Sequence, residues 1–495
     1  MRMLQRQRAM PGGPAGRGRK LPLMLATALL PTLGGCLHQE LSDPALDIPA
    51  SYRATRGKPN AALPKLDWWR GFHSPELTAL MEEALVANLD IAAAVARIIE
   101  ADALARIAGA PLLPLVNFDA SGTRSRAPGG RDLGFMQVSL NASYEIDFWG
   151  KNRAGLRAAE EGAVASRYDR DVVALSTLAA VATQYFLVLG SQDRLRVGQE
   201  NVRAAARVLD IIKQRRDVGT ASELDVAQQE AVVATQRANL PTLEQAVLQT
   251  KNTLAVLVGR APEYANIRGG SLYRLPIPPV SPGLPSELLT RRPDIREAEA
   301  QLAAADANVY AARAAMLPSI TLTGTGGFES HALKTLFNPP QSAFYTAVAG
   351  LTQPVFDGFR LKGLLNQAQG HQEELLQIYR HTVISAFSDV ENGLVGVQQM
   401  AERDRREREV VEASRRAFDL SETRLREGTI DLVTLLNTQQ TLFQAQDTLA
   451  LVKIARFQAV VSLFQALGGG WSMPAQDPLL RAAGPRADGG MKEQR

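Results

Sequence analysis

Cysteine and histidine are the two residue types that this sequence hardly uses. The chain has one cysteine, Cys36, and five histidines among 495 residues. A single thiol cannot form an intramolecular disulfide and cannot by itself supply a cysteine-based zinc site. The sequence contains no His-Glu-x-x-His pattern, Gly-x-Ser-x-Gly elbow, phosphate loop or Cys-His set. These absences argue against an enzyme, and we interpret His371 and His381, with Glu373 between them, as a helix surface rather than a metal site.

The segment that ends at Cys36 is typical of a lipoprotein signal peptide. Residues 1–20 carry six basic side chains and no acidic one, and residues 21–30 form an apolar run too short to span a bilayer as a mature helix. Leu33-Gly34-Gly35-Cys36 resembles the bacterial lipobox, which implies cleavage before Cys36 and covalent lipid on its sulfur and its new amino group. An ordinary signal peptide with an incidental cysteine is the alternative.

The positive net charge of the chain comes from that segment. Basic residues outnumber acidic ones by 55 to 51, but residues 1–36 hold six of the basic residues and none of the acidic ones. The remainder therefore has 49 basic and 51 acidic residues, a net charge of −2. This balance does not favour a nucleic-acid partner. The avoidance of cysteine suits an envelope protein that folds without disulfides.

The rest of the chain is predicted to be a tandem repeat. The pattern at Asp90-Ile91 recurs at Asp294-Ile295, 204 residues later, and "REGTIDL" around Gly428 echoes "RDVGTASEL" around Gly219, 209 residues earlier. A spacing sustained over so much chain indicates two copies of one structural unit. The predicted divisions are a signal peptide (1–36), an extended N-terminal segment (37–73), a first repeat (74–273), a proline-rich linker (274–285), a second repeat (286–470) and a flexible C-terminal tail (471–495).

Each repeat is predicted to contain a helix, a strand pair and a long helical hairpin. Ser74 and Ser286 are the expected N-caps of the opening helices. From residue 136 to 148 apolar and polar residues alternate, which indicates a long strand with one apolar and one polar face, as in outer-membrane barrels. A soluble sheet with one buried face is the alternative. The predicted strands are 115–125, 136–148, 319–328 and 342–356.

Proline is missing from the two segments that follow the strand pairs. None lies between Pro128 and Pro241 or between Pro354 and Pro474. These segments permit helices of roughly 50 or more residues, about 75 to 100 Å long at 1.5 Å per residue. Apolar residues recur in them at seven-residue spacing, as in coiled coils. The predicted hairpin tips are Gly219 with Thr220 and Gly428 with Thr429.

Two segments of these helices have more than one interpretation. Residues 172–192 are uncharged and long enough to span a membrane, but polar residues interrupt them and their counterpart near 381–400 contains two acidic residues. We interpret 172–192 as the buried face of a helix in a large bundle, with a transmembrane helix as the alternative. The charge run 401–416 has mixed sign and is interpreted as a solvated helix face.

The predicted strands raise a problem of closure. Two strand pairs cannot enclose a lumen, because the smallest single-chain membrane barrels have about eight strands. Open sheet edges are not tolerated in lipid, so the chain must pool its strands with copies of itself. Three protomers would give a barrel of about twelve strands, continued by a ring of long helices. A hollow object of this kind, anchored by lipid, suggests a conduit.

At this point the sequence resembles a known family. The motifs "WWRGFHSPELTALMEEALVANLDI", "SYEIDFWGKNRA", "PVFDGFRLK" and "REGTIDLVTLLNTQQTL", in this order within residues 45–470, are similar to those of the outer membrane factor (TolC-like) family of tripartite efflux pumps, lipoprotein subgroup. The resemblance implies a homotrimer in the outer membrane, with a 12-stranded transmembrane β-barrel (four strands per protomer) on a periplasmic α-helical barrel. It also implies two partners, a periplasmic adaptor and an inner-membrane transporter, usually of the resistance-nodulation-division (RND) type.

The same resemblance implies a periplasmic gate. The first-hairpin aspartate of the family falls on Asp225 in "SELDVAQ", the hydrophobic gate position on Val433 beside Thr434, and the second-hairpin aspartate on Asn437 in "LLNTQ". Because Asn437 lacks the charge, we expect weaker cation selectivity than in relatives. The alternative is that Asp225 and Asn437 only cap or bridge helices. No cofactor is expected beyond the lipid on Cys36.

Three questions of function stay open at this level. A duct for type I protein secretion is the nearer alternative to small-molecule efflux, and a trimeric coiled-coil surface protein is the more distant one. The transported substrates are not determined by the sequence.

Overall fold

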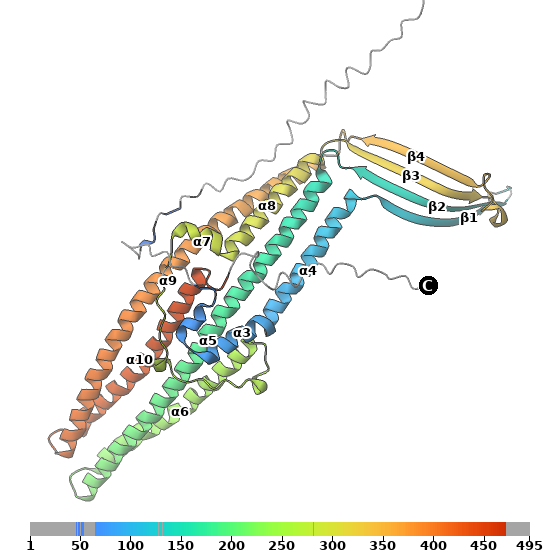
Figure 1. The fold of residues 1–495 in the computed structure, drawn as a ribbon. Coiled ribbons are helices and arrows are strands. Elements are labelled where there is room, and N and C mark those ends of the chain that lie inside the picture. Colours follow the sequence, from blue (N-terminus) through green and yellow to red (C-terminus); the bar gives the residue numbers. More distant parts are fainter. Residues whose placement is uncertain are drawn as a thin grey trace, which may run out of the picture.

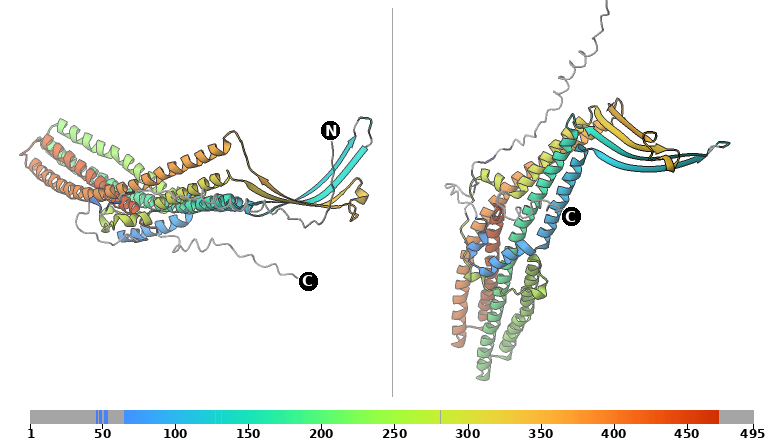
Figure 2. Two further views of the ribbon diagram at one scale, coloured as in Figure 1. Left: turned by 90° about the horizontal axis from the view of Figure 1, so that it is seen from above. Right: turned by 45° about the vertical axis from the view of Figure 1, so that its right-hand side comes forward.

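A computed structural model describes residues 46, 48–49, 51–53, 65–126, 128–130, 132–280 and 282–471. The predicted signal peptide with Cys36, and the predicted tail beyond Trp471, lie outside these residues. The molecule is elongated: Figure 1 shows a body of long helices with one curved sheet at its end. The two helical hairpins point away from the sheet in every view (Figure 2).

Helices and strands follow the same order twice along the chain. The first series is α3 (Pro75–Ala87), α4 (Leu89–Gly109), β1 (Leu115–Arg126), β2 (Asp132–Ile146), α5 (Lys151–Asp217) and α6 (Glu223–Leu257). The second series is α7 (Pro285–Arg291), α8 (Pro293–Ala314), β3 (Ser319–Ser330), β4 (Ala343–Thr352), α9 (Arg360–Arg426) and α10 (Leu432–Ala466). Helices α5 and α9 have 67 residues each, and α6 and α10 have 35 each. At 1.5 Å per residue, α5 and α9 are about 100 Å long.

The opening helix of each series begins differently. Ser74 is the N-cap of α3, because its Oγ accepts a hydrogen bond from Leu77 N at 3.2 Å, with Pro75 at the first helical position. The prediction that Ser286 caps α7 is wrong. The N-cap is Leu284, two residues earlier, so the helix begins at Pro285, and the Glu287 carboxylate accepts a hydrogen bond from Leu284 N at 3.2 Å. Proline already suits the first helical position, so the helix starts there.

Residues 37–73 were predicted to be an extended segment, but the part of it directly before α3 is not simply extended. A 3₁₀-helix, η3 (Trp68–Phe72), inserts its aromatic side chains into the core, where Trp68 stacks on Phe464 of α10 at 4.8 Å between ring centroids. Tyr52 is buried against α7, α9 and α10 in a separate cluster. Large aromatic side chains stabilise a fold by burying their area, which explains why this segment folds onto the helices.

The four strands form one antiparallel sheet in the order β1-β2-β3-β4. Val138 of β2 pairs with Ala120 of β1 and with Phe328 of β3, and the register continues without a bulge along all three pairings. The strands are close to those predicted, but β2 ends at Ile146 and β4 at Thr352, so Phe148 and residues 353–356 lie beyond them. Beyond β2, the Trp149 indole donates to the Pro318 carbonyl at 2.7 Å, where the chain turns into α5.

The sheet has two chemically different faces, because successive strand residues point to opposite sides. One face carries apolar side chains and glycines over most of its length. The other face is mainly hydroxyl, amide and carboxyl. The apolar face contains Val116, Phe118, Ala120, Met136, Val138, Leu140, Ala142, Tyr144, Ile146, Ile320, Leu322, Phe328, Tyr345, Ala347, Ala349 and Leu351.

The main hydrophobic core lies where α5 crosses η3, α3 and α10. Leu178, Val181 and Phe186 of α5 are buried there, so residues 172–192 contribute a buried helix face, as predicted. By length and composition α5 and α10 each contain an 18-residue window apolar enough to cross a membrane, but 50% and 61% of those windows are buried inside the protein. Their apolar residues therefore serve the core. A second core, around Ile212 and Leu435, joins the two helical hairpins.

Candidate functional site

The candidate site lies where the two helical hairpins reverse. Gly219 (φ 78°) follows α5 and Gly428 (φ 74°) follows α9, and both have the left-handed backbone that glycine adopts without strain. In each turn the next residue closes the helix end. Thr220 donates from its amide to Arg215 O at 2.7 Å, and Thr429 does the same to Arg424 O at 2.9 Å. These are the C-terminal caps that end helices, and they place both predicted tips at turns.

The two tips also contact each other. The Arg215 guanidinium, at the end of α5, donates to the carbonyl of Leu425 near the end of α9. Val226 of α6 and Leu432 of α10 are buried in the hydrophobic core that joins the hairpins. The tips are therefore one packed unit within the protomer.

Asp225 is the third residue of α6 and forms a capping box with Ser222. Its carboxylate accepts from Ser222 N at 2.8 Å and from Ser222 Oγ at 2.9 Å, while Asp225 N donates back to Ser222 Oγ at 3.2 Å. A capping box satisfies two backbone donors at a helix start. The structure thus gives Asp225 a helix-capping role, the alternative that the sequence left open, and its role at a gate stays a prediction.

Val433 and Asn437 lie on one side of the first turns of α10. Val433 is 54% exposed although it is apolar. Both residues line a groove of about 900 Å³ between α10 and the α5–α6 hairpin. Asp225 and Thr434 are not among its lining residues. Thr434 N instead donates to the N-cap carboxylate of Asp431 at 2.8 Å.

Several polar residues in or beside this groove were not predicted from the sequence: Gln439, Arg194 and Asp447 line it, and Gln229 is buried next to Gln439. Gln229 and Gln439 are 0% and 1% exposed, and the Gln229 amide donates to Ala205 O at 2.9 Å and, at 3.4 Å, to Gln439 Oε1. Farther from the tips, Arg194 of α5 and Asp447 of α10 face each other across the groove. Gln439 lies four residues after the buried Leu435, so a glutamine in the apolar seam was the available signal.

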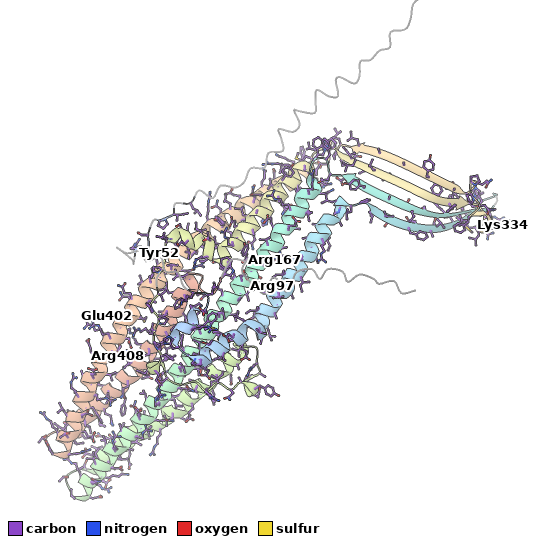
Figure 3. All side chains as sticks on the ribbon, viewed as in Figure 1. Tyr52, Arg97, Arg167, Lys334, Glu402 and Arg408 are labelled. Atoms are coloured by element: carbon purple, nitrogen blue, oxygen red, sulfur yellow. The ribbon has the colours of Figure 1, made fainter. Side chains whose placement is uncertain are left out.

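The charge run 401–416 is not solvated throughout, which corrects the prediction. Glu402, Arg405 and Arg406 are exposed, and both arginines pair with Glu402. Asp404 is only 2% exposed and faces Lys453 and Arg456 of α10, with Oδ2 at 2.6 Å from Arg456 Nη1. Figure 3 shows Glu402 and Arg408 on α9 at this level. The packing of α10 against α9 buries Asp404 rather than its neighbours. A local charge pattern could not predict this, because the partner Lys453 is 49 residues away in sequence.

The buried charges shift each other's titration. Burial alone would raise the pKa of Asp404, but the hydrogen bond from Arg408 and the charge of Lys453 outweigh it and hold that pKa below its usual range. Burial lowers the pKa of Lys453 by more than the Asp404 carboxylate raises it. The Lys453 ammonium also lies 5.2 Å from the centroid of the Tyr273 ring, which connects the last residue of the predicted first repeat to this cluster.

Of the two histidines considered in the sequence, His371 has an acidic neighbour on the same helix. His371 Nδ1 lies 3.0 Å from Glu374 Oε2, both exposed on α9, whereas Glu373 accepts from Gln377. Across the part of the chain that the structure describes, no three His, Cys, Asp or Glu residues are grouped so that they could hold a metal ion.

Comparison with known proteins relates this architecture to a family. The outer membrane efflux protein family model matches residues 80–260 and 284–469. The pyoverdine export outer membrane protein OpmQ of Pseudomonas putida is 42% identical, and the match covers 86% of this chain and 92% of that protein. The toluene efflux pump outer membrane protein TtgF of Pseudomonas putida is 32% identical, over 84% of this chain and 88% of its own.

Solved structures agree. The outer-membrane channel OprN has a TM-score of 0.81 at 27% identity and covers 88% of this chain and 100% of its own. The open state of the Neisseria gonorrhoeae MtrE outer membrane channel has a TM-score of 0.80 at 28% identity, over 87% and 97%. The likeness extends through both series of helices and strands, and the chain belongs to the outer membrane efflux protein family.

Proposed function

We propose that three copies of this chain form the exit duct of a tripartite efflux system and passively conduct small molecules across the outer membrane. The observation that carries the proposal is the four-stranded sheet, whose outer strands β1 and β4 each leave one edge unpaired within the protomer. Its apolar face suits lipid, but lipid does not tolerate open edges. Pairing β4 of one copy with β1 of the next removes the edges.

The stoichiometry follows from the strand count together with the family resemblance. Single-chain membrane barrels need about eight strands or more, so one protomer is insufficient and three supply about twelve. The equal lengths of α5 and α9, and of α6 and α10, support a tandem repeat in which both hairpins contribute alike to a helical barrel. That barrel continues the duct into the periplasm.

The proposed partners are a periplasmic adaptor and an inner-membrane transporter of the RND type. The names of OpmQ and TtgF indicate siderophore and solvent export by those relatives. Pyoverdine is therefore the first cargo to test with this chain. The test measures pyoverdine export by a host that lacks its own outer-membrane duct, with and without this chain. Equal export in the two cases would contradict pyoverdine as the cargo.

The lipid anchor on Cys36 is a further part of the proposal. Mass spectrometry of the mature N-terminus should show cleavage before Cys36 and added acyl mass, and Cys36→Ser should abolish both. A mature chain that begins elsewhere, or an unmodified Cys36, would remove the anchor without affecting the duct.

The decisive experiment for the duct is the oligomeric mass of the detergent-extracted protein, measured by light scattering with a correction for bound detergent. We expect three times the protomer mass. A monomer with an intact sheet would contradict closure by shared strands, since β1 and β4 would then remain open.

A further inference from the structure

The far end of β1 carries two arginines on the otherwise apolar face of the sheet. Alternation along the strand puts Arg124 and Arg126 on the same face as Val116 and Phe118. Both arginine side chains are open to their surroundings, with 80% and 74% of their area exposed. Charged residues on the lipid face of a barrel destabilise it least near the membrane interfaces. The height of these two residues along the barrel therefore decides what they meet.

The strand geometry puts both arginines just beyond the apolar band of the sheet. On β2 this band runs from Met136 to Ile146, which is about 34 Å at about 3.4 Å per residue. A strand tilt of about 40° reduces this length to a height of about 26 Å, close to the apolar height of about 25 Å in outer-membrane barrels. Met136 pairs with Gly122 of β1. Arg124 and Arg126 are the next two residues of this face beyond that pair, so their guanidinium groups lie at the level of the lipid headgroups.

One carboxylate lies between the two arginines and shows that they converge. Oδ2 of Asp132, on β2, accepts a hydrogen bond from Arg124 Nη2 at 2.9 Å, and its Oδ1 lies 3.5 Å from Arg126 Nε. Both guanidinium groups thus reach a single anionic group, and two positive groups with one negative group leave a net charge of +1. A guanidinium has five N–H donors, and among the described residues no other acceptor binds either arginine. Most of their donors are therefore available to a second anion.

The other charges at this end of the sheet do not reverse that sign. Lys334, in η7 (Leu333–Thr335) between β3 and β4, is exposed at the same end (Figure 3) and has no ion pair among the described residues. Leu333 and Phe337 beside it are 67% and 62% exposed, and apolar side chains next to a cation suit a membrane interface. Glu329 of β3 is near this end but lies on the polar face. The surface that meets the headgroups is therefore positive.

We propose that Arg124 and Arg126 form a binding site for the phosphate of a phosphorylated glycolipid in the outer leaflet. The inference rests on the proposed function, because the arginines meet headgroups only when copies close the barrel with their apolar faces in lipid. In that arrangement the helices lie in the periplasm, so the far end of the sheet lies in the outer leaflet, whose lipids carry phosphorylated sugars. The acyl chains of the bound lipid lie along Val116 and Phe118, on the same face of the same strand.

The chemistry of the site favours an anionic glycolipid over a zwitterionic phospholipid. The planar fork of arginine matches the oxygens of a phosphate, and such charge-assisted hydrogen bonds are the strong ones. A zwitterionic headgroup such as phosphatidylethanolamine carries its own ammonium, which needs a carboxylate nearby. Asp132 is already bound to the arginines. A phosphorylated sugar brings negative charge without an ammonium, so the positive site binds it more tightly.

The test is lipid binding by the purified full-length trimer, measured by native mass spectrometry after its own lipids have been removed by detergent exchange. The probes are diphosphoryl lipid A, phosphatidylglycerol, which is anionic but has no sugar, and phosphatidylethanolamine. We expect the parent to bind lipid A more tightly than either phospholipid. Equal binding of lipid A and phosphatidylglycerol would contradict a glycolipid site, and equal binding of all three would contradict any selection by charge.

Substitutions at the site provide the second readout. Arg124→Gln and Arg126→Gln should each weaken lipid A binding about fivefold, and the double variant about 25-fold, because each basic residue at a charged membrane surface contributes separately. Asp132→Asn removes the competing carboxylate and should tighten lipid A binding. Arg405→Gln, which removes an exposed arginine from α9, is the matched control and should bind like the parent. Binding of phosphatidylethanolamine should stay the same in every variant.

The measurements distinguish the failure of the lipid site from the failure of the duct. A trimer whose double variant binds lipid A as tightly as the parent does would overturn the site and leave the duct standing. A parent protein that forms no trimer would overturn the duct and the site together. Unchanged trimer mass in the variants separates weaker lipid binding from a defect of assembly.

Discussion

Arg194 of α5 donates two hydrogen bonds to the Asp447 carboxylate of α10, from Nε at 2.7 Å and from Nη2 at 3.1 Å. This bidentate pair joins the hairpin of the first series to that of the second, across the groove that Val433 and Asn437 also line. Bidentate arginine–carboxylate pairs add geometric specificity to their energy. The pair is thus placed to hold the hairpins at one separation.

Breaking the Arg194–Asp447 pair should change the separation of the two hairpins while lowering the stability of the fold only slightly. Both side chains are partly exposed, and exposed pairs contribute about 0.2 to 1 kcal/mol, so we expect Arg194→Ala to lower the free energy of unfolding by less than about 1 kcal/mol. We expect its resting conductance in bilayers to rise. Arg405→Ala, which breaks pairs within α9 only, is the control. Equal conductance in the two variants would contradict a holding role.

Asp404 should matter far more to stability than its exposed neighbours. Asp404→Asn leaves Lys453 buried without its carboxylate, and removing one partner of a buried pair costs about 3 to 5 kcal/mol. Urea unfolding of the trimer should show this loss, whereas Glu402→Gln should leave the midpoint unchanged. Lys453→Met in the Asp404→Asn background should recover part of the loss, because it removes the unpaired charge. No recovery would mean that Arg408 and Arg456 determine the cost.

Asp404 should also make the free energy of unfolding depend on pH in the acid range. The folded-state pKa of Asp404 is lowered, so its stabilising contribution is present above the unfolded pKa and is lost as the pH falls through the folded value. Below about pH 4, where an unperturbed aspartate protonates, the parent should lose stability more steeply than Asp404→Asn. Parallel curves of unfolding free energy against pH would contradict this assignment.

Glu297 of α8 should act in the opposite direction. Burial, followed by the charges of Asp169 and Asp294, raises the pKa of Glu297 to about 7. The folded state therefore holds a proton that the unfolded state releases, and stability falls as the pH rises from about 4.5, the usual range of glutamate, toward 7. Glu297→Gln should be more stable than the parent above pH 7 and equal to it near pH 4. Glu299→Gln, an exposed neighbour, should show no such crossover.

Val433 and Asn437 remain the predicted gate residues. Val433→Ala removes an exposed apolar side chain beside the groove and should raise the resting conductance. Asn437→Asp adds one carboxylate per protomer and should move the reversal potential further to the cation side, because charge rings select ions by their field. An unchanged conductance in the first variant, or an unchanged potential in the second, would argue that these residues only line the groove.

Local patterns predicted the elements because each has a local physical cause. The gaps without proline allow α5 and α9, and glycine followed by threonine ends each of them at its tip. The alternation that predicted β2 is caused by one face meeting lipid or core and the other meeting water. The predicted ends of the strands differ from the observed ones, because where an element ends depends on contacts outside it. Ile146 ends β2 where Trp149 binds the Pro318 carbonyl, 169 residues away in sequence.

The candidate site was predictable only where the signal was local. The tip glycines could be identified from the sequence, because a reversal between two helices needs a residue that tolerates positive φ. Helix capping by Asp225 was one of two alternatives that the sequence left open, whereas the burial of Asp404 could not be identified from the sequence. Asp225 is at the start of a helix, where its carboxylate accepts a hydrogen bond from Ser222 N. Asp404 is one charge among many in its segment, and α10 decides which of them is buried.

The sequence by itself determined the repeat pattern, the long helices, the two-faced strands and the positions of the reversals, because period, proline and glycine act within a few residues. The tertiary structure decided which polar residues are enclosed and which strand faces share a surface. Register places Asp119, Glu145 and Glu329 on one side of the sheet, and helix packing pairs Asp404 with Lys453. Those relationships join residues far apart in the chain, so only the folded geometry brings their charges together.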